Sequence, residues 1–293
     1  MHMSADAHDR HEQDLMLLRA RRARAREHHM AFGAIWAEYL EGRPHQLRTT
    51  ERADGTTSIT LHRTEPFPTQ LSLVFGELLY QLRASLDTCL YSVASMVSGQ
   101  SPPPAAERLE WPIRTTQEDW DKQANRYKHL PAPITNALQM IQPYRAQVPS
   151  LNCLQILHDL ARVDRHRRAH PLELYISRLR ITWDKQKIDL VHTTRQGIVQ
   201  DGDEIVRLRL RDRTVLTPDT FDLTCEFDPE ILDIQESTGP GGASGRPWDS
   251  LGSRLGALVQ AVDEYTDGLV EIAKDLGIQE PWSGVVAPVQ TKG

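Results

Sequence analysis

The chain has 293 residues, 39% of them hydrophobic and 25% charged, which is the composition of a globular protein with one large or two small domains. Its formal net charge of −6 gives no global attraction to phosphate backbones or anionic lipids, so nucleic-acid binding would need a local basic patch. The polar residues 1–14 lack the apolar run of a signal peptide, and no apolar run reaches membrane-spanning length. We therefore expect a cytoplasmic protein without a membrane partner.

Four long helices are predicted, and the first two come before residue 100. The first runs from about Glu12 to Glu41, where Gly42 and Pro44 are typical stop signals. A short strand follows at residues 57–62. The second helix runs from about Pro68 to Ser98, with apolar residues at spacings of three and four.

The third helix is predicted at about residues 150–168, before Pro171. Period-two alternation then indicates strands with one buried face, at residues 175–183, 206–211 and 221–227. The fourth helix begins near Asp249 or Ser250, either of which is a good N-cap, and stops at Gly277.

This order of elements predicts an α+β fold that is mostly α: a bundle of about four long helices with a small antiparallel β-sheet inserted before the C-terminal helix. The expected divisions are a helical bundle at 1–170, a β-rich insert at 171–235, a flexible connector at 236–247, and a C-terminal bundle helix and tail at 248–293.

Charged residues occupy apolar faces of the second and third helices. Arg83 and Asp87 are in register with leucines, and Asp164 continues an apolar series. Buried unpaired charges cost several kcal/mol, so we expect these charges to pair, Arg83 with Asp164, and Asp87 with Arg165 or Arg167. The result is either an ion-pair network that fixes helix packing or a polar pocket.

In the functional interpretation, His158 or His166 serves the pocket in proton transfer or ligand contact. A metal site is not predicted, because Pro171 should end the helix before His170 can project beside His166. The three widely spaced cysteines match neither a metal site nor a disulfide framework, and no nucleophile motif or cofactor-binding motif occurs.

Two basic features invite a nucleic-acid interpretation. One is a run in the first helix, formed by Arg19, Arg21, Arg22, Arg24 and Arg26, which is typical of a solvated surface or of phosphate binding. The other is the strand row Arg207, Arg209 and Arg211, which we expect to pair with the row Asp222, Thr224 and Glu226 on another strand.

Five stretches together form a distinctive pattern: Pro66-Phe67-Pro68, FGELLYQLRASLD at 75–87, Trp111-Pro112-Ile113, Gln142-Pro143-Tyr144 and LARVDRHR at 160–167. In order and spacing they resemble a bacterial family that is frequent in actinobacteria. Members of that family read roughly L-R-S-A-L-D-H, F-P-I, Q-P-Y and D-K-H-R, and the family supplies no established activity. The resemblance implies that its recurring polar positions here are Arg83, Asp87, Asp164, His166 and Arg167.

The same pattern resembles, more distantly, the helical HEPN superfamily. Many HEPN proteins are metal-independent ribonucleases that use an Arg, four to six intervening residues and then a His, paired across a dimer. Thr88 stands where the family has that histidine, which implies an inactive copy. Arg165 and His170 reproduce the spacing on another helix, so they are the ribonuclease pair that the resemblance implies.

The leading hypothesis is a cytosolic bacterial protein that acts by binding, through a charged interhelical centre, as a homodimer. A HEPN-like ribonuclease is one alternative, with RNA as a partner that the net charge does not support. A small-ligand binding protein is another, which an apolar pocket between the bundle and the insert would reveal.

Overall fold

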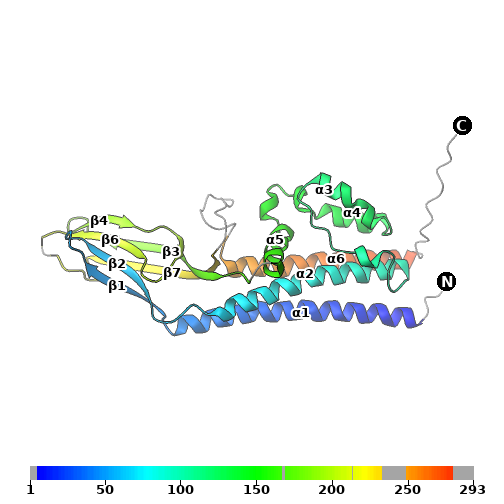
Figure 1. Ribbon diagram of the computed structural model, residues 1–293, viewed down its shortest axis with the longest axis horizontal. Coiled ribbons are helices and arrows are strands. Elements are labelled where there is room, and N and C mark those ends of the chain that lie inside the picture. The colour runs from blue at the N-terminus through cyan, green and yellow to red at the C-terminus, as the bar shows by residue number, and fades with distance from the viewer. Residues whose placement is uncertain (1–4, 167–168, 213, 233–248, 280–293) are drawn as a thin grey trace. The chain divides into compact units, whose positions relative to one another are not determined.

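The computed structural model describes residues 5–166, 169–212, 214–232 and 249–279 (Figure 1). Within them the fold is α+β, as predicted, with six α-helices and two antiparallel sheets. The predicted connector at 236–247 lies outside the described residues, and so does Arg167.

The chain forms two compact units. The helical unit consists of Met1–Glu27, Glu77–Val163 and Gly256–Gly293, and the mixed unit consists of His28–Gly76 and Asp164–Leu255. Each unit is described by itself below.

Each of the four predicted long helices has a counterpart in the structure. They are α1 (Ala5–Glu41), α2 (Thr69–Ser98), α5 (Cys153–His166) and α6 (Leu251–Gln279). Helix α6 begins after Ser250, whose hydroxyl accepts a hydrogen bond from the Ser253 backbone N–H at 3.1 Å. This bond satisfies one of the amides that a helix N-terminus leaves without an intrahelical acceptor, so Ser250 is the N-cap.

Two shorter helices were not predicted, α3 (Gln117–Gln123) and α4 (Ala132–Met140). Both belong to the helical unit, together with four 3₁₀ turns: η1 (Ala106–Arg108), η2 (Ala124–Tyr127), η3 (Pro143–Arg145) and η4 (Pro149–Leu151). Helix α3 is capped by Thr116, whose hydroxyl accepts from the Asp119 N–H at 3.1 Å. Two turns of helix are too short to show a clear 3.6-residue period, so capping is the main local signal.

The β-structure is larger than the predicted insert. One sheet has the order β1-β2-β6-β4 and the other the order β5-β3-β7. The strands are β1 (His45–Glu51), β2 (Thr57–Arg63), β3 (Leu172–Trp183), β4 (Ile188–Thr193), β5 (Gly197–Val199), β6 (Glu204–Leu210) and β7 (Phe221–Ile231). The early hairpin β1–β2 joins the late strands, with Ile59 of β2 opposite Val206 of β6.

A single apolar cluster accounts for this pairing. It is formed by residues of both sheets: Ile59, Leu61, Leu174, Ile176, Ile188, Val199, Ile205, Val206 and Leu208. Strand β2 carries an apolar face that a two-stranded hairpin alone could not bury, and pairing with β6 brings it into this core.

The expected pairing between the arginine row of β6 and the acidic row of β7 is wrong, because these strands belong to different sheets. Arg207 pairs instead with Glu204 on its own strand at 2.7 Å, and Arg211 pairs with Asp189 on β4. On β7, Glu226 accepts from Arg178 of β3 at 2.9 Å. Arg207, Arg211 and Glu226 are therefore paired within their own sheets, whereas Arg63 of β2 reaches across to Glu173 of β3 at 2.9 Å.

Two close contacts of charged side chains involve helix ends in the mixed unit. Arg254 near the start of α6 donates to the Glu230 carboxylate of β7, and the two side chains are 3% and 0% exposed. Asp164 of α5 lies against α2 at Gly76, where a Cβ would approach the Asp164 Oδ1 atom to 2.7 Å. Glycine at position 76 therefore permits this close approach of the two helices.

Candidate functional site

The helical unit contains a clamp of α2 side chains around the Trp111 peptide. The Arg83 Nη2 atom donates to the Trp111 carbonyl at 3.1 Å and to Glu110 Oε1 at 3.1 Å. The Trp111 N–H donates to Asp87 Oδ1 at 2.8 Å, and the same oxygen lies 3.1 Å from Arg83 Nη2. Arg83 and Asp87 are one helical turn apart, so together they satisfy both polar groups of one residue's backbone.

A second clamp holds the next residues of the same segment. The Gln142 amide nitrogen donates to the Pro112 carbonyl at 3.0 Å and to the Leu138 carbonyl at 2.7 Å. The Gln142 Oε1 atom accepts from the Arg114 N–H at 2.8 Å. Gln142 is only 1% exposed, and its bonds to the Pro112 and Leu138 carbonyls are buried. The segment that starts at Trp111 thus contacts both the stretch at 83–87 and the stretch at 142–144.

These contacts correct the predicted partner of Arg83 and leave those of Asp87 as predictions. We expected Arg83 to take Asp164 as its acceptor, but its acceptors come from its own helix and from the segment that follows. Of the predicted partners of Asp87, the Arg165 side chain and Arg167 lie outside the described residues. The motifs at Trp111 and Gln142 do not by themselves reveal that Arg83 and Asp87 bind the Trp111 backbone, or that the Gln142 side chain binds the backbone of Pro112 and Arg114.

The clamp contains a buried positive charge, which disfavours a second one nearby. The Arg83 side chain is 4% exposed, against 36% for Asp87 and 47% for Glu110. Arg83 Nη1 and Arg114 Nε are buried without a hydrogen-bond partner among the described residues. Burial lowers the pKa of His158, and Arg83 lowers it further, so His158 is a neutral imidazole at pH 7.

The other predicted site residues lie in the mixed unit. Arg165 and His166 end α5, and their side chains lie outside the described residues. His170 follows the helix, is 5% exposed, and packs edge-on against Phe75 with ring centroids 5.4 Å apart. An imidazole in this position has little access to an RNA substrate.

Beside Trp111 the helical unit has an apolar pocket of about 290 Å³. It is lined by Trp111, by Ala137 and Met140 of α4, by Ile141, which follows α4, and by five residues of α6: Glu264, Tyr265, Gly268, Leu269 and Ile272. The α6 residues recur at spacings of three and four, so they form one face of that helix. The clamp around Trp111 fixes one wall of this pocket.

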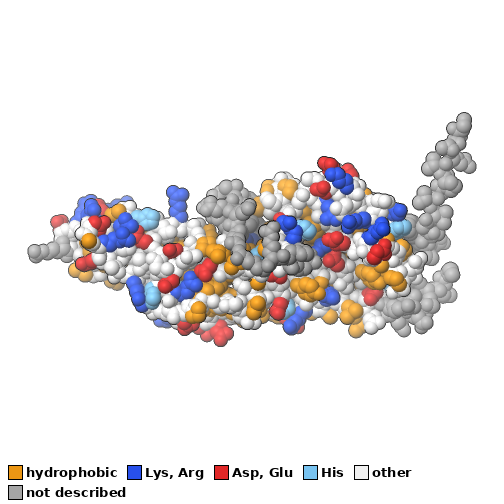
Figure 2. Space-filling model, in the orientation of Figure 1, with side chains coloured by type: hydrophobic (Ala, Val, Ile, Leu, Met, Phe, Trp, Pro, Cys, Tyr) orange, Lys and Arg blue, Asp and Glu red, His pale blue; other side chains and the backbone are white. Residues whose placement is uncertain are grey.

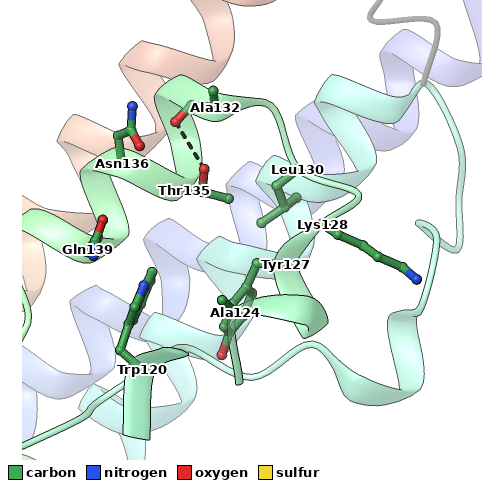
Figure 3. A pocket seen from close by; sticks show the side chains of 9 residues that line it. All are labelled: Trp120, Ala124, Tyr127, Lys128, Leu130, Ala132, Thr135, Asn136 and Gln139. Atoms are coloured by element: carbon green, nitrogen blue, oxygen red, sulfur yellow. Dashed lines mark hydrogen bonds between the residues drawn. The ribbon is translucent and has the colours of Figure 1, made fainter. Parts of the chain in front are cut away.

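A second pocket, of about 320 Å³, lies among α3, η2 and α4 (Figure 3). Trp120 and Tyr127 stack there with centroids 5.9 Å apart and an interplanar angle of 14°. In Figure 3, Lys128 points away from the aromatic pair, and Thr135 donates to the Ala132 carbonyl at 3.0 Å. This pocket offers polar edges, but its lining contains no buried polar atom that lacks a partner.

Among the described residues we find neither a reactive thiol nor a metal-binding cluster. Burial raises the pKa of all three thiols, that of Cys225 to about 11, so each is protonated at pH 7. The same residues contain no group of three or more His, Cys, Asp or Glu side chains that could hold a metal ion. No helix within the described ranges has the length and apolarity needed to cross a membrane.

The arginine run of α1 is partly neutralised within the helical unit. Arg22 binds Asp263 at 2.6 Å and also binds Asp267, and Arg26 binds Asp263 at 2.6 Å. On the face seen in Figure 2, basic and acidic side chains are intermixed. This arrangement weakens the phosphate-binding interpretation of the run.

Comparisons of the chain with protein-family models, with curated proteins and with solved structures find no match. The geometry of the helical unit therefore carries the functional argument.

Proposed function

We propose that this protein binds a small molecule in the apolar pocket beside Trp111, with the charged centre around Arg83 acting as its support. The proposal keeps the predicted mode of action, binding through a charged interhelical centre, but gives that centre a positioning role. It also takes up the small-ligand alternative, with the pocket placed between α4 and α6 in the helical unit.

The observation that carries the proposal is that α6 has a glycine, Gly268, at a position with room for a side chain. Gly268 lies in the interior of α6, where glycine costs about 1 kcal/mol relative to alanine. A Cβ there would meet no atom within 4 Å, so neither close packing nor a positive φ requires glycine. Its effect is to keep the pocket open on the face formed by Tyr265, Leu269 and Ile272.

The clamp supports binding because it makes the Trp111 wall rigid. Arg83 and Asp87 fix the Trp111 peptide from α2, and Gln142 fixes the peptides that follow. A wall that is ordered before the ligand arrives costs less conformational entropy on binding. Most hydrogen-bonding groups of the clamp are used in these internal bonds.

The lining is better suited to binding than to catalysis. Its only acidic or phenolic groups are Glu264 and Tyr265, and burial raises the pKa of the Tyr265 phenol. Tyr265 is therefore a neutral hydrogen-bonding group at pH 7. Glu264 is exposed and accepts a hydrogen bond from Gln260 at 2.7 Å. The remaining lining residues are apolar or glycine.

The test uses toluene as a probe of the pocket and compares wild-type protein with Gly268→Leu, which fills it. At a tenfold excess of toluene over its Kd, binding adds about 1.4 kcal/mol and raises the Tm of wild-type protein by roughly 2–4 °C. The filled variant should show no rise, because leucine occupies the same space.

The matched control is Gly252→Leu on the same helix. A Cβ there meets only Ser250 Oγ, at 3.9 Å, and Gly252 does not line the pocket. This variant should respond to toluene as the wild type does. An equal response of wild type and Gly268→Leu, or no response of either, would refute the proposed pocket.

A further inference from the structure

One edge of the β-structure in the mixed unit is uncovered. Strand β1 is the outermost strand of its four-stranded sheet, and no described strand pairs with its other side (Figure 1). It pairs with β2 over seven residues without a register shift, and all of them but His45 are exposed. At the opposite edge of the same sheet, a register shift interrupts β4 between Leu190 and His192. A long, regular edge such as β1 is a template for pairing with another chain, whereas an irregular edge such as β4 is protected.

The hydrogen bonds at both ends of β1 show which of its backbone groups remain available. The Thr64 N–H donates to the Pro44 carbonyl at 2.8 Å, and the Arg52 N–H donates to the Thr56 carbonyl at 2.8 Å. In an antiparallel pair, residues whose backbone groups face the partner alternate with residues whose backbone groups face away. The even-numbered positions of β1 therefore bond to β2, and the N–H and C=O groups of the odd-numbered positions in 45–51 point outward.

The same edge exposes an apolar side chain that belongs to the core face of the sheet. Leu47 lies opposite Leu61, which is part of the buried apolar cluster, and directly opposite residues share one face of a sheet. Leu47 is nevertheless 39% exposed, because no further strand covers it. A groove of about 300 Å³ begins at this point, and its lining includes Leu47, Ile59 of β2, and Phe221 and Leu223 of β7.

We infer that the β1 edge binds a second copy of this chain, by antiparallel pairing of the two β1 strands about a two-fold axis with Leu47 opposite Leu47. The outward backbone groups of the two strands then exchange hydrogen bonds, and the two leucines bury each other at the mouths of the two grooves. This inference goes beyond the proposed small-molecule site and does not depend on it, because β1 belongs to the mixed unit and that site to the helical unit.

The charges along the strand select this register. A pairing with Arg48 opposite Arg48 would oppose like charges, and one with Thr49 opposite Thr49 would place Leu47 against Glu51. With Leu47 at the axis no like charges are opposed, and Glu51 faces the position of Arg43 in the second copy. Neither Glu51 nor Arg43 has an ion-pair partner among the described residues. The edge is therefore complementary to itself in backbone, apolar contact and charge.

The experiment measures the dimer Kd by sedimentation velocity between about 1 and 300 µM. Wild-type protein should pass from a monomer of 33.3 kDa to a species of twice that mass as its concentration rises. Leu47→Glu opposes two carboxylates at the axis and should raise the Kd at least about tenfold. The matched control is Val191→Glu on β4, where the valine is 49% exposed and the register shift interrupts the ladder. This variant should dimerise as the wild type does.

Amide hydrogen exchange provides a second readout that needs no substitution. Pairing of the two edges should slow exchange at the Leu47 and Thr49 amides in concentrated protein but not in dilute protein. The even-numbered amides of β1, which bond to β2, should be protected equally at both concentrations. This alternation distinguishes strand pairing from a dimer that forms through side chains alone, and it decides the matter if Leu47→Glu folds poorly.

Three outcomes would overturn the inference. The first is a protein that stays monomeric over the whole concentration range, and the second is a dimer whose Kd is the same in Leu47→Glu as in the wild type. The third is protection of the Leu47 and Thr49 amides that does not depend on concentration, which would mean that another segment of the same chain covers the edge.

Discussion

The ion pairs between α1 and α6 in the helical unit permit a quantitative test of burial. Arg22 donates from Nε to Asp263 at 2.6 Å, and from its two terminal nitrogens to both oxygens of Asp267. The exposed fractions are 10% for the Arg22 side chain and 21% for that of Asp263. Nearby, Arg24 and Glu27 form a pair at 2.8 Å with side chains that are 59% and 56% exposed.

The two pairs should differ in coupling energy because water competes for one and is largely excluded from the other. For Arg22 and Asp263 we expect a coupling of about 1–3 kcal/mol, the range for charge-assisted bonds of partly buried groups. For Arg24 and Glu27 we expect at most about 0.5 kcal/mol, as for exposed pairs on one helix. Both pairs include α1, so the comparison holds the helix constant.

The assay is a double-mutant cycle for each pair, measured by urea denaturation. The substitutions are Arg22→Met with Asp263→Asn, and Arg24→Met with Glu27→Gln, which remove the charge while keeping the unbranched stem of the arginine and the shape of the carboxylate. Coupling at Arg22 should persist in 0.5 M salt, because burial limits screening. Equal couplings for the two pairs would refute the argument from burial.

Three further predictions follow from the mixed unit. Gly76→Ala should cost about 1–3 kcal/mol in urea denaturation because its Cβ meets the Asp164 carboxylate, and the cost should vanish in an Asp164→Ala background; a cost that persists would show that another contact is responsible. Burial, with a smaller contribution from Arg63, lowers the pKa of His45 from 6.5 to about 4. Between these values the unfolded chain binds a proton that the folded chain does not, so the free energy of unfolding is highest above pH 6.5. Toward pH 4 it should fall by about 1–2 kcal/mol, after allowing for the partial exposure of His45. In His45→Phe the free energy of unfolding should fall much less over the same range. Purified protein should not cleave total RNA, with or without chelator, since His170 is buried; cleavage that Arg165→Ala abolishes would contradict this.

The long helices were predictable because each carries many turns of one period. The unbroken apolar stripe of α6 and the stop signals after α1 and α2 defined them to within a few residues at most ends. Strand β1 was missed for the opposite reason. From His45 to Glu51 all residues but the first are exposed, so no apolar alternation marks the strand. Its partner β2 was found, but not its place in the sheet with β6.

The site was predictable in part. Their register with leucines drew attention to Arg83 and Asp87, and the structure shows that Arg83 is buried, while their role in a site stays a prediction. Their partners were not predictable, because Arg83 and Asp87 bind the backbone of Trp111, and a backbone group leaves no mark on the sequence. The pocket depends on Gly268 and on helix α4, which was too short to predict. The homodimer, the cytoplasmic location and the ribonuclease pair stay predictions.

The strand order has a consequence for how the chain is made. The bond between Ser58 and Glu204 joins residues 146 positions apart, on neighbouring strands β2 and β6. At a synthesis rate of about 5–20 residues per second, the hairpin β1–β2 waits on the ribosome for roughly 7–30 s before β6 exists. During that time Ile59 and Leu61 have no core, and β2 is an open edge that can pair with a neighbouring nascent chain. Yield in cells should therefore depend on the rate of translation between residues 63 and 204 and on chaperones that shield this edge, more than on the stability of the finished fold.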